Sequence, residues 1–495
     1  MDKEVSLNPN QLVCHLNKPS RDFSRADIVR FIEERGIRQI NFRYVGGDGR
    51  LKTLNFVINN RRHLEHVLST GERVDGSSLF SYISATSSDL YVVPRFRTAF
   101  VNPFNEIPTI DMLCSYFTSN GEPLESAPES LVRRAHDVLK QKTGVTFQAM
   151  GELEYYLISE IDSIYPIVQQ KGYHESHPFS KWGCVRREAL KVISEMGGSI
   201  KYGHAEVGNI IHDDQEMVQH EIEFLPEDVE VAADQLVLAK WAIREIAYKY
   251  GLEVSFAPKI IVGHAGSGMH VHTRLLRNGE SVMVQDGRLS DDARRMIAGF
   301  LTLAPSLTAF GNTVPTSFLR LVPHQEAPTA ICWGDRNRSV LVRVPLGWLG
   351  VSDMIRRVNP LEPPARDEST RDNQTVELRS PDGSANVHQL LAGMAVAVRQ
   401  GLENPDALNI AEKLYVSTDA SKVADLEQLP ASCYEAAQRL LAQREIYEKD
   451  GVFPADMIDK LAAQLQAYDD KGLSEKLYGN EQELKKLVSR FLHCG

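Results

Sequence analysis

The sequence predicts an α+β fold in which a small N-terminal unit precedes a much larger one. A helix and two alternating strands are expected between residues 24 and 58, and Pro, Gly and Ser gather between about residues 103 and 128. Beyond that stretch, strand-like and helix-like segments alternate for most of the remaining length. We therefore expect an N-terminal arm at residues 1–23, a small domain at 24–115 and a large domain at 116–495.

The small unit begins with a helix and a hairpin. Ser24 can cap the helix RADIVRFIEER, and Gly36 can end it. The apolar residues Ile28, Phe31 and Ile32 share one face of this helix. Apolar and polar residues then alternate on both sides of a GGDG turn, as expected of paired strands, at Ile40, Phe42 and Tyr44 before it and Leu54, Phe56 and Ile58 after it.

Two long helices are expected in the large unit, at roughly residues 226–250 and 386–400. The first opens with Pro226, Glu227 and Asp228, which are residue types that favour helix starts. Its apolar residues recur at helical spacing and predict a stripe that packs in the core, at Leu236, Ala239, Ile243 and Ala247.

The composition restricts the possible partners. The 495 residues carry a formal net charge of −11, and 42% of them are hydrophobic. Because nucleic acids and anionic membranes bind basic surfaces, and no dense run of Lys and Arg occurs, we expect neither partner. The N-terminus lacks the order of a secretion signal, no uncharged segment approaches the ~18 residues that span a bilayer, and the six cysteines are scattered. A cytoplasmic protein with reduced thiols and a small-molecule partner is the expectation.

Four strand-like segments place ionisable residues two positions apart. This spacing puts both members of a pair on the same side of a strand, so these sides could together line one polar cavity. Gathered charges are costly to bury unless cations neutralise the carboxylates and an anion neutralises the arginines, which favours divalent metal and phosphate. A solvated edge face is the alternative for any single pair. The pairs are Glu152 and Glu154, Glu221 and Glu223, His270 and His272, and Glu377 and Arg379.

Two further tracts support such a site. In GHAGSGMHVH, Gly263, Gly266 and Gly268 permit close approach of the backbone to a ligand, and both histidines point the same way. The tract FLRLVPHQEAPTAICWGDRNRSVLVRVP holds guanidinium groups that could bind a triphosphate and a carboxylate bidentately. Together these features indicate metal-assisted phosphoryl transfer, with a structural histidine pair and structural ion pairs as alternatives. The charged residues of the second tract include Arg320, Glu326, Arg338 and Arg343.

From about Ser24 to the C-terminus, the sequence resembles the glutamine synthetase family. The matching segments occur in the family's order: VDGSSL, GELEYYLI, HAEV with QHEIEF, FAPK followed by GSGMHVH, RLVPHQEAP, NRSVLVRVP and ELRSPDGSAN. The resemblance implies a β-grasp domain followed by a large catalytic domain with an open antiparallel β-barrel flanked by helices. It also implies a ring-forming homo-oligomer, expected to be a dodecamer, in which the small domain of one subunit completes its neighbour's active site.

The implied activity is ATP-dependent formation of glutamine from glutamate and ammonia through a γ-glutamyl phosphate. Two ligand sets for Mg²⁺ or Mn²⁺ follow from the resemblance, namely Glu154, Glu206 and Glu221 for one cation and Glu152, His270 and Glu377 for another. The implied contacts with ATP, the co-substrate, are His272, Arg338 and Arg343.

The resemblance also assigns roles in the chemistry. Asp75 would take the proton from ammonium, Arg338 would stabilise phosphate charge, and Glu326 would close a flap over the intermediate. These three form the implied catalytic set. The implied substrate-binding set is Ser78, Asp89, Tyr173, Gly266, Arg320, Glu326 and Arg379.

Several positions depart from the family pattern. Where the family commonly has Asn just before GSGMH, this chain has Ala265, so the contact with the amino-acid substrate must be altered or supplied elsewhere. Thr375 occupies a position often held by an arginine near ATP, and Arg274 replaces a small residue next to His272. The segment KLYVST around Tyr415 only partly matches the loop that is adenylylated in some bacterial members. Glutamate–ammonia ligation is therefore the leading hypothesis, with ligation to a polyamine, ethanolamine or methylamine as the alternative and a non-catalytic relative as a third.

Overall fold

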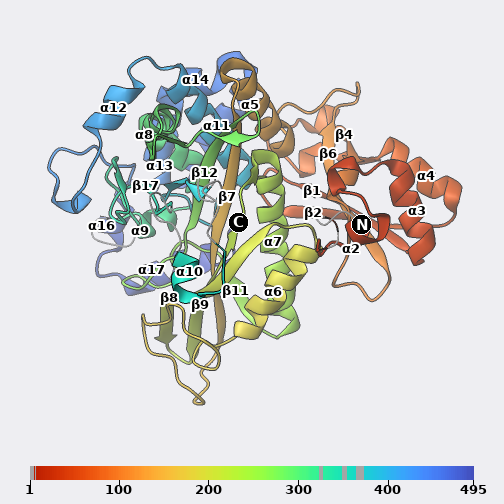
Figure 1. The fold of residues 1–495 in the computed structure, drawn as a ribbon, viewed down its shortest axis with the longest axis horizontal. Helices are drawn as coiled ribbons and strands as arrows, with labels where there is room; N and C mark the ends of the chain where they lie inside the picture. Colours follow the sequence, from red (N-terminus) through yellow and green to blue (C-terminus); the bar gives the residue numbers. More distant parts are fainter. Residues whose placement is uncertain (1–4, 6, 323–326, 348–353, 364–372) are drawn as a thin grey trace.

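The computed structural model describes residues 5, 7–322, 327–347, 354–363 and 373–495 and contains two units, each built on a large β-sheet (Figure 1). The N-terminal unit, coloured red to orange, lies at one end of the molecule's long axis, and the larger unit occupies the rest. At their junction, Arg95 donates two hydrogen bonds, of 2.6 and 3.0 Å, to the buried carboxylate of Asp234. The small unit is thereby fixed to the helices of the large one.

The N-terminal sheet contains the predicted hairpin. β1 (Gln39–Val45) and β2 (Leu51–Val57) are antiparallel, with Ile40 opposite Phe56, while β1 also pairs in parallel with β6 (Thr109–Phe117). The strand order is β2-β1-β6-β4-β3, and β5 pairs with β6. The remaining elements of this unit are α3 (Arg25–Arg35), α4 (Arg61–Thr70), β3 (Glu72–Asp75), β4 (Asp89–Pro94) and β5 (Phe100–Val101).

Local sequence signals account for the start of this unit. The side chain of Ser24 accepts a hydrogen bond from the backbone N–H of Asp27, and Gly36 ends α3 with φ of 63°, as the sequence predicts. Within the expected arm, α2 (Gln11–Leu16) forms a six-residue helix, which is too short to show a periodic pattern. Its Leu12 and Val13 are buried in the core of the N-terminal unit.

The large unit contains a ten-stranded sheet in the order β16-β17-β18-β12-β7-β9-β8, with β10 and β11 paired to β7 and β13 paired to β12. All of these pairings are antiparallel except that between β16 and β17. β14 and β15 form a separate hairpin. The strands are β7 (Thr146–Glu160), β8 (Ile200–His212), β9 (Gln215–Phe224), β10 (Glu227–Asp228), β11 (Glu253–Ser255), β12 (Met269–Arg277), β13 (Glu280–Ser281), β14 (Val284–Gln285), β15 (Arg288–Leu289), β16 (Trp333–Asp335), β17 (Val342–Val344) and β18 (Val376–Leu378).

Long helices share one hydrophobic core with this sheet. The predicted stripe of α7 (Val229–Lys249) is fully buried, but the helix begins three residues later than predicted because Glu227 and Asp228 pair with β7. The other helices are α5 (Pro128–Thr143), α6 (Gly183–Glu195), α8 (Asp291–Gly311), α9 (Ser317–Arg320), α10 (Met354–Val358), α11 (Val387–Glu403), α12 (Ala407–Lys413), α13 (Cys433–Ala442), α14 (Arg444–Glu448), α15 (Ala455–Gln466), α16 (Leu473–Leu477) and α17 (Glu481–Phe491).

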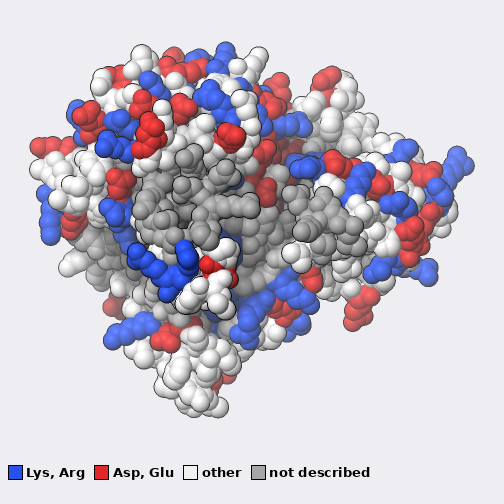
Figure 2. Space-filling view, in the orientation of Figure 1, with Lys and Arg blue, Asp and Glu red and all other residues white. Residues whose placement is uncertain are grey.

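The surface is consistent with the composition. On the face shown in Figure 2, the Lys and Arg side chains of the described residues are interspersed with Asp and Glu. Among the described helices, none is long and apolar enough to cross a bilayer.

Candidate active site

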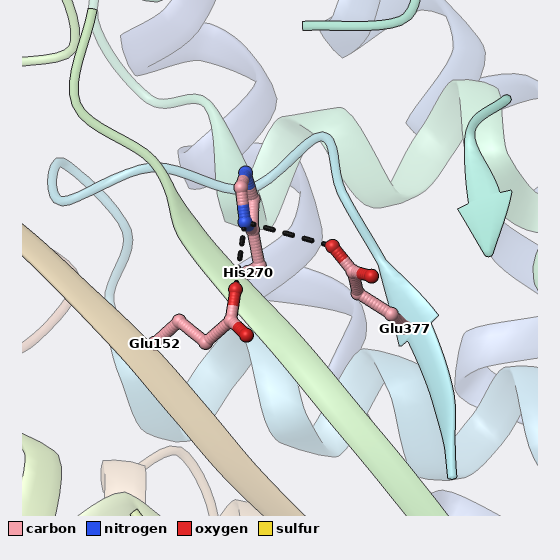
Figure 3. A group of neighbouring side chains, drawn as sticks. All are labelled: Glu152, His270 and Glu377. Atoms are coloured by element: carbon pink, nitrogen blue, oxygen red, sulfur yellow. Dashed lines mark hydrogen bonds and ion pairs between the residues drawn. The ribbon is translucent and has the colours of Figure 1, made fainter. Parts of the chain in front are cut away.

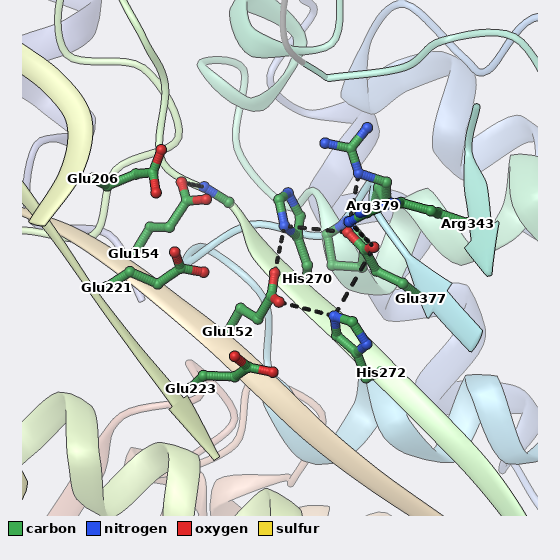
Figure 4. Close-up of polar contacts among 12 residues, drawn as sticks. Glu152, Glu154, Glu206, Glu221, Glu223, His270, His272, Arg343, Glu377 and Arg379 are labelled. Atoms are coloured by element: carbon green, nitrogen blue, oxygen red, sulfur yellow. Dashed lines mark hydrogen bonds and ion pairs between the residues drawn. The ribbon is translucent and has the colours of Figure 1, made fainter. Parts of the chain in front are cut away.

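A cavity of about 850 Å³ lies over one face of the ten-stranded sheet and is lined by all four of the predicted residue pairs. The lining includes seven carboxylates, which come from β7, β8, β9, β10 and β18, together with side chains of Lys, Arg and His. Strands far apart in the sequence therefore bring their ionisable residues together (Figure 4). The carboxylates are Glu152, Glu154, Glu206, Glu221, Glu223, Glu227 and Glu377.

Strand register explains one of the two predicted ligand sets. Glu152 on β7 lies opposite His270 on β12, and Glu377 on β18 lies opposite His272, the next residue of β12 on the same face. The Nδ1 atom of His270 is 2.9 Å from Glu152 Oε2 and 3.6 Å from Glu377 Oε1 (Figure 3). Glu152, His270 and Glu377 offer three ligand atoms within 4.8 Å of one another, as expected of a shared cation site.

The second predicted set, Glu154, Glu206 and Glu221, also lines the cavity, and His204 lies beside it. Glu154 lies opposite Glu221, and both point toward Glu206 in Figure 4, but the ligand atoms within 4.8 Å of one another belong to His204, Glu206 and Glu221. Glu154 Oε2 instead accepts a hydrogen bond of 2.6 Å from the backbone N–H of Gly268. His204 therefore joins this group, and the period-two spacing of His204 and Glu206 on β8 could have indicated it.

Both groups fit a hard divalent cation. Carboxylate oxygens with one imidazole nitrogen are a donor set that Mg²⁺ or Mn²⁺ accepts. Burial, followed by repulsion from Glu152, Glu154 and Glu206, raises the pKa of Glu221 well above its usual value. Burial and repulsion from Glu154 also raise the pKa of Glu206 to about 7. Such mutual repulsion is relieved when a cation binds between the carboxylates.

The pKa of Glu152 is shifted in the opposite direction. Burial disfavours its charged form, but the nearby imidazoles of His272 and His270 outweigh that effect and hold the pKa of Glu152 well below its usual value. Glu152 is thus ionised at neutral pH and shared between the two histidines. Its Oε1 is 2.9 Å from His272 Nε2, and its Oε2 is 2.9 Å from His270 Nδ1.

Replacing Glu206 by Gln is expected to change how stability depends on pH in metal-free protein. Because the pKa of Glu206 is raised from 4.5 to about 7, its contribution is fully present below pH 4.5 and is lost as the pH rises through about 7. The Gln side chain cannot ionise, so the stability of the variant relative to wild type should increase over this interval. Urea unfolding with a chelator at pH 4.5, 6 and 8 measures the difference, and a constant difference would contradict the prediction.

A third group of possible ligands shares Glu152 with the first. Ligand atoms of Glu152, Glu223 and His272 also lie within 4.8 Å of one another. Glu223 accepts a hydrogen bond of 2.6 Å from Lys201, so a lysine already neutralises this carboxylate. The two-residue spacing predicts Glu223 as half of a pair but does not indicate Lys201, which occupies the neighbouring strand and lines the cavity.

Arginines from separate segments converge on the same cavity. Arg343 Nη1 donates to Glu377 Oε2 at 3.1 Å, and Arg379 Nε donates to Glu377 Oε1 at 3.0 Å. Arg338 lines the cavity, and its positive charge favours the ionised form of Glu206 and so acts to lower the pKa of that carboxyl. The guanidinium of Arg320 is buried and donates to the backbone oxygen of Ser380 at 2.9 Å and to His270 Nε2 at 3.2 Å. Arg320 thus orients a predicted metal ligand, and its predicted contact with substrate stays a prediction.

A second, smaller cavity shares part of this lining and reaches the glycine-rich tract. Gly266 and Arg320 line it together with Glu154, His270 and Arg338. A Cβ atom at Gly266 would lie 2.4 Å from the backbone oxygen of Pro258, which is too close for any side chain. The chain needs glycine here to bring its backbone up to the site.

The predicted ammonia pocket lies elsewhere. Asp75 and Asp89 are opposite one another on β3 and β4, and both are exposed, as is Ser78. Among the described residues that line the cavity, none belongs to the N-terminal unit. Hydrogen bonds from Ser78, Ser88 and Ser77 hold the pKa of Asp75 well below its usual value, so this carboxylate is ionised on the surface of the chain. A second subunit would be needed to bring such a residue to a cavity.

Three other predicted residues have different outcomes. Tyr173 lines the cavity and packs its ring 4.2 Å from that of His174 and 5.6 Å from that of His204. Glu326 lies outside the described residues. Tyr415 is 42% exposed, and its regulation by adenylylation stays untested.

Comparison with known proteins identifies the two units. Residues 36–119 match the family profile for the glutamine synthetase β-grasp domain, and residues 125–467 match that for the glutamine synthetase catalytic domain. The chain is 28% identical over 441 residues to glutamine synthetase from Staphylococcus epidermidis, covering 86% of this chain and 91% of the relative. It is 29% identical over 478 residues to glutamine synthetase from Frankia alni, covering 88% and 94%.

Solved structures agree on the fold. Plasmodium falciparum glutamine synthetase, determined by cryo-electron microscopy, superposes with a TM-score of 0.75 at 17% identity, covering 91% of this chain and 97% of that one. GmaS without ligand gives a TM-score of 0.70 at 19% identity, covering 90% and 97%. The fold and the site define an ATP-dependent ligase. The chain belongs to the glutamine synthetase family, and the predicted β-grasp domain and open, helix-flanked catalytic sheet are confirmed.

Proposed function

We propose that this protein uses ATP to join glutamate to ammonia, forming glutamine through γ-glutamyl phosphate. The observation that carries the proposal is the meeting of cation-ligand groups with three arginines in one cavity. Carboxylates gathered around Glu152 and Glu206 suit cations, whereas Arg338, Arg343 and Arg379 suit a phosphate or a carboxylate. A ligase that activates a carboxylate with ATP needs both kinds of charge side by side.

In the first step, an oxygen of the glutamate side-chain carboxylate attacks the γ-phosphorus of ATP, and the bond from that phosphorus to the bridging oxygen of ADP breaks. Two groups of residues would hold Mg²⁺ or Mn²⁺, and the bound cations would spread the charge of the triphosphate. One group is Glu152, His270 and Glu377, and the other is Glu206 and Glu221 with Glu154 or His204. Arg343 and Arg338 would stabilise the transferring phosphoryl group. Arg379 would hold the acyl phosphate.

In the second step, the nitrogen of ammonia attacks the activated carbonyl carbon, phosphate leaves with the bonding electrons, and the nitrogen gives one proton to the departing phosphate as the amide forms. Ammonium must first lose a proton, and Asp75 of an adjacent subunit would bind the cation and accept that proton. Its carboxylate is ionised because Ser78, Ser88 and Ser77 donate to it. Ring assembly and inter-subunit sites are therefore part of the proposal.

The second candidate is ligation of a γ-glutamyl or other carboxylate to an organic amine, and one observation bears on its acid substrate. At Ala265, where the family commonly has Asn, the backbone N–H donates to Gln170 Oε1 at 2.9 Å and the carbonyl accepts from Tyr156 at 2.8 Å. Both polar groups of this residue are thus used within the chain, and its side chain offers no amide. Substrate selection must depend on other groups.

Purified protein supplied with ATP, Mg²⁺, glutamate and ammonium is expected to release phosphate and form glutamine in equal amounts. The same assay with methylamine, ethanolamine or putrescine in place of ammonium should give much slower release. Mass spectrometry of the products measures both rates. Activity confined to an organic amine would replace the leading proposal by the second candidate.

A further inference from the structure

The cavity changes character along its length. Going from Glu154 to Glu152 to Met150 on β7, from Glu221 to Glu223 to Leu225 along and just beyond β9, and from Glu377 on β18 to Thr375 just before it, carboxylates give way to uncharged side chains. Glu227, which pairs with Ala149 next to Met150, is the carboxylate of the lining that lies beyond them. Pro226, Pro345 and Leu346 line the cavity as well. The end marked by Met150 and Leu225 is therefore the less polar one.

One guanidinium lies at this less polar end. Arg274 follows His270 and His272 at the same two-residue spacing on β12, so its side chain points to the same face, and it lines the cavity. β12 and β18 are antiparallel with Thr273 opposite Val376, so Arg274 and Thr375 come next in register. The Thr375 hydroxyl lies 3.0 Å from His272 Nδ1.

We propose that Arg274 binds the N7 edge of the purine base of the nucleoside triphosphate, an inference that rests on the proposed use of ATP. The phosphates belong near the cation-ligand groups and Arg343, so the base extends toward the end where Met150 and Leu225 offer apolar contacts. A purine presents N7 as a hydrogen-bond acceptor, whereas a guanidinium carries donors alone. Arg274 is the charged donor that this end of the cavity supplies on β12.

Hydrogen bonds to side chains of neighbouring strands fix the orientation of the Arg274 side chain. Its Nε donates to Gln148 Oε1 at 2.9 Å, and Gln148 Nε2 donates to Asp228 Oδ1 at 3.0 Å. Asp228 belongs to β10, which pairs with β7, so this chain of hydrogen bonds is anchored in the sheet. A guanidinium held in this way loses little freedom when it binds a ligand, which favours a specific contact over a general attraction for phosphate.

Binding of ATP and of 7-deaza-ATP, which has a carbon in place of N7, tests the proposal in wild type and in Arg274→Ala by calorimetry with Mg²⁺. Wild type is expected to bind ATP about tenfold more tightly than 7-deaza-ATP, because a charged hydrogen bond is lost. In Arg274→Ala the two affinities should be equal, and both should match that of wild type for 7-deaza-ATP within about threefold. Arg277→Ala, which alters an exposed arginine of the same strand paired with Asp292, is the matched control and should retain the tenfold preference.

The outcomes separate this inference from the proposed function. Equal binding of the two nucleotides by wild type, or an unchanged preference in Arg274→Ala, would overturn the role of Arg274 even if ligation occurs. Wild type that shows the preference but forms no amide would overturn the proposed function and leave the nucleotide contact in place. A uniform loss of affinity in Arg274→Ala with the preference intact would show an electrostatic effect on the phosphates instead.

Discussion

Glu377→Gln is expected to lower ATP-dependent ligation by roughly a thousandfold or more. Glu377 is the carboxylate at which the two kinds of charge in the cavity meet, since it is 3.6 Å from His270 and accepts hydrogen bonds from Arg343 and Arg379. Gln has nearly the same size and can still accept from one arginine, but it lacks the negative charge that a divalent cation requires. Phosphate release with saturating ATP, glutamate and ammonium measures the effect.

Measurements of metal affinity and of thermal stability show whether a Glu377 variant loses activity through its cation site or through its folding. Mn²⁺ affinity, followed by the electron paramagnetic resonance of the free ion, should fall by more than about 100-fold at one class of site in Glu377→Gln. Glu377→Ala should also reduce thermal stability, because the buried Arg379 would lose its acidic partner. Glu483→Gln, which changes an exposed glutamate on α17, is the matched control. Wild-type turnover in Glu377→Gln would rule out its assignment as a cation ligand.

Much of the fold follows from patterns that depend on near neighbours in the chain. The cap at Ser24, the ending at Gly36 and the hairpin around the GGDG turn are determined by local hydrogen bonding and backbone conformation, and all three are predicted correctly. The start of α7 is not, because the competing interaction is pairing of Glu227 and Asp228 with a strand about 80 residues earlier in the chain. The short helix α2 is similarly held by burial against the N-terminal core and not by its own periodicity.

In the candidate site, too, some features follow from local spacing in the sequence and others depend on contacts between distant strands. A two-residue spacing places each pair on one face of its strand, and this suffices to predict that Glu152, His270 and Glu377 share a cavity. It does not predict that His204 joins Glu206 and Glu221. The pairing of β8 with β9 shifts register between Ala205 and Asn209, which changes how β8 presents its side chains, and a backbone N–H occupies one oxygen of Glu154. Irregular pairing of this kind depends on contacts across strands and leaves little trace in the local sequence.

Subunits carrying Asp75→Ala and Glu377→Gln are each expected to be almost inactive, yet to recover activity when they assemble together. The reason is that Asp75 is exposed on the N-terminal unit, whereas the described residues lining the chain's own cavity come from the large unit. In a ring with one neighbour on each side, random assembly of equal amounts gives about one quarter of sites an intact Asp75 and an intact Glu377. Co-expressed, unfractionated protein should therefore show about one quarter of wild-type turnover per subunit.

A second mixture distinguishes an inter-subunit site from one built within a single chain. Wild type combined with the double variant Asp75→Ala/Glu377→Gln should give about one quarter of full activity if neighbouring subunits share each site, but about one half if each chain is self-sufficient. Asp75 is exposed, and the hydrogen bonds it accepts come from Ser77 and Ser78 of its own turn and from Ser88, so its replacement should leave the thermal midpoint nearly unchanged. Absence of recovery in the first mixture, with half activity in the second, would place the proton acceptor within the chain that holds the cations. The nucleophile would then have to reach the acyl phosphate without help from the Asp75 of a neighbouring subunit.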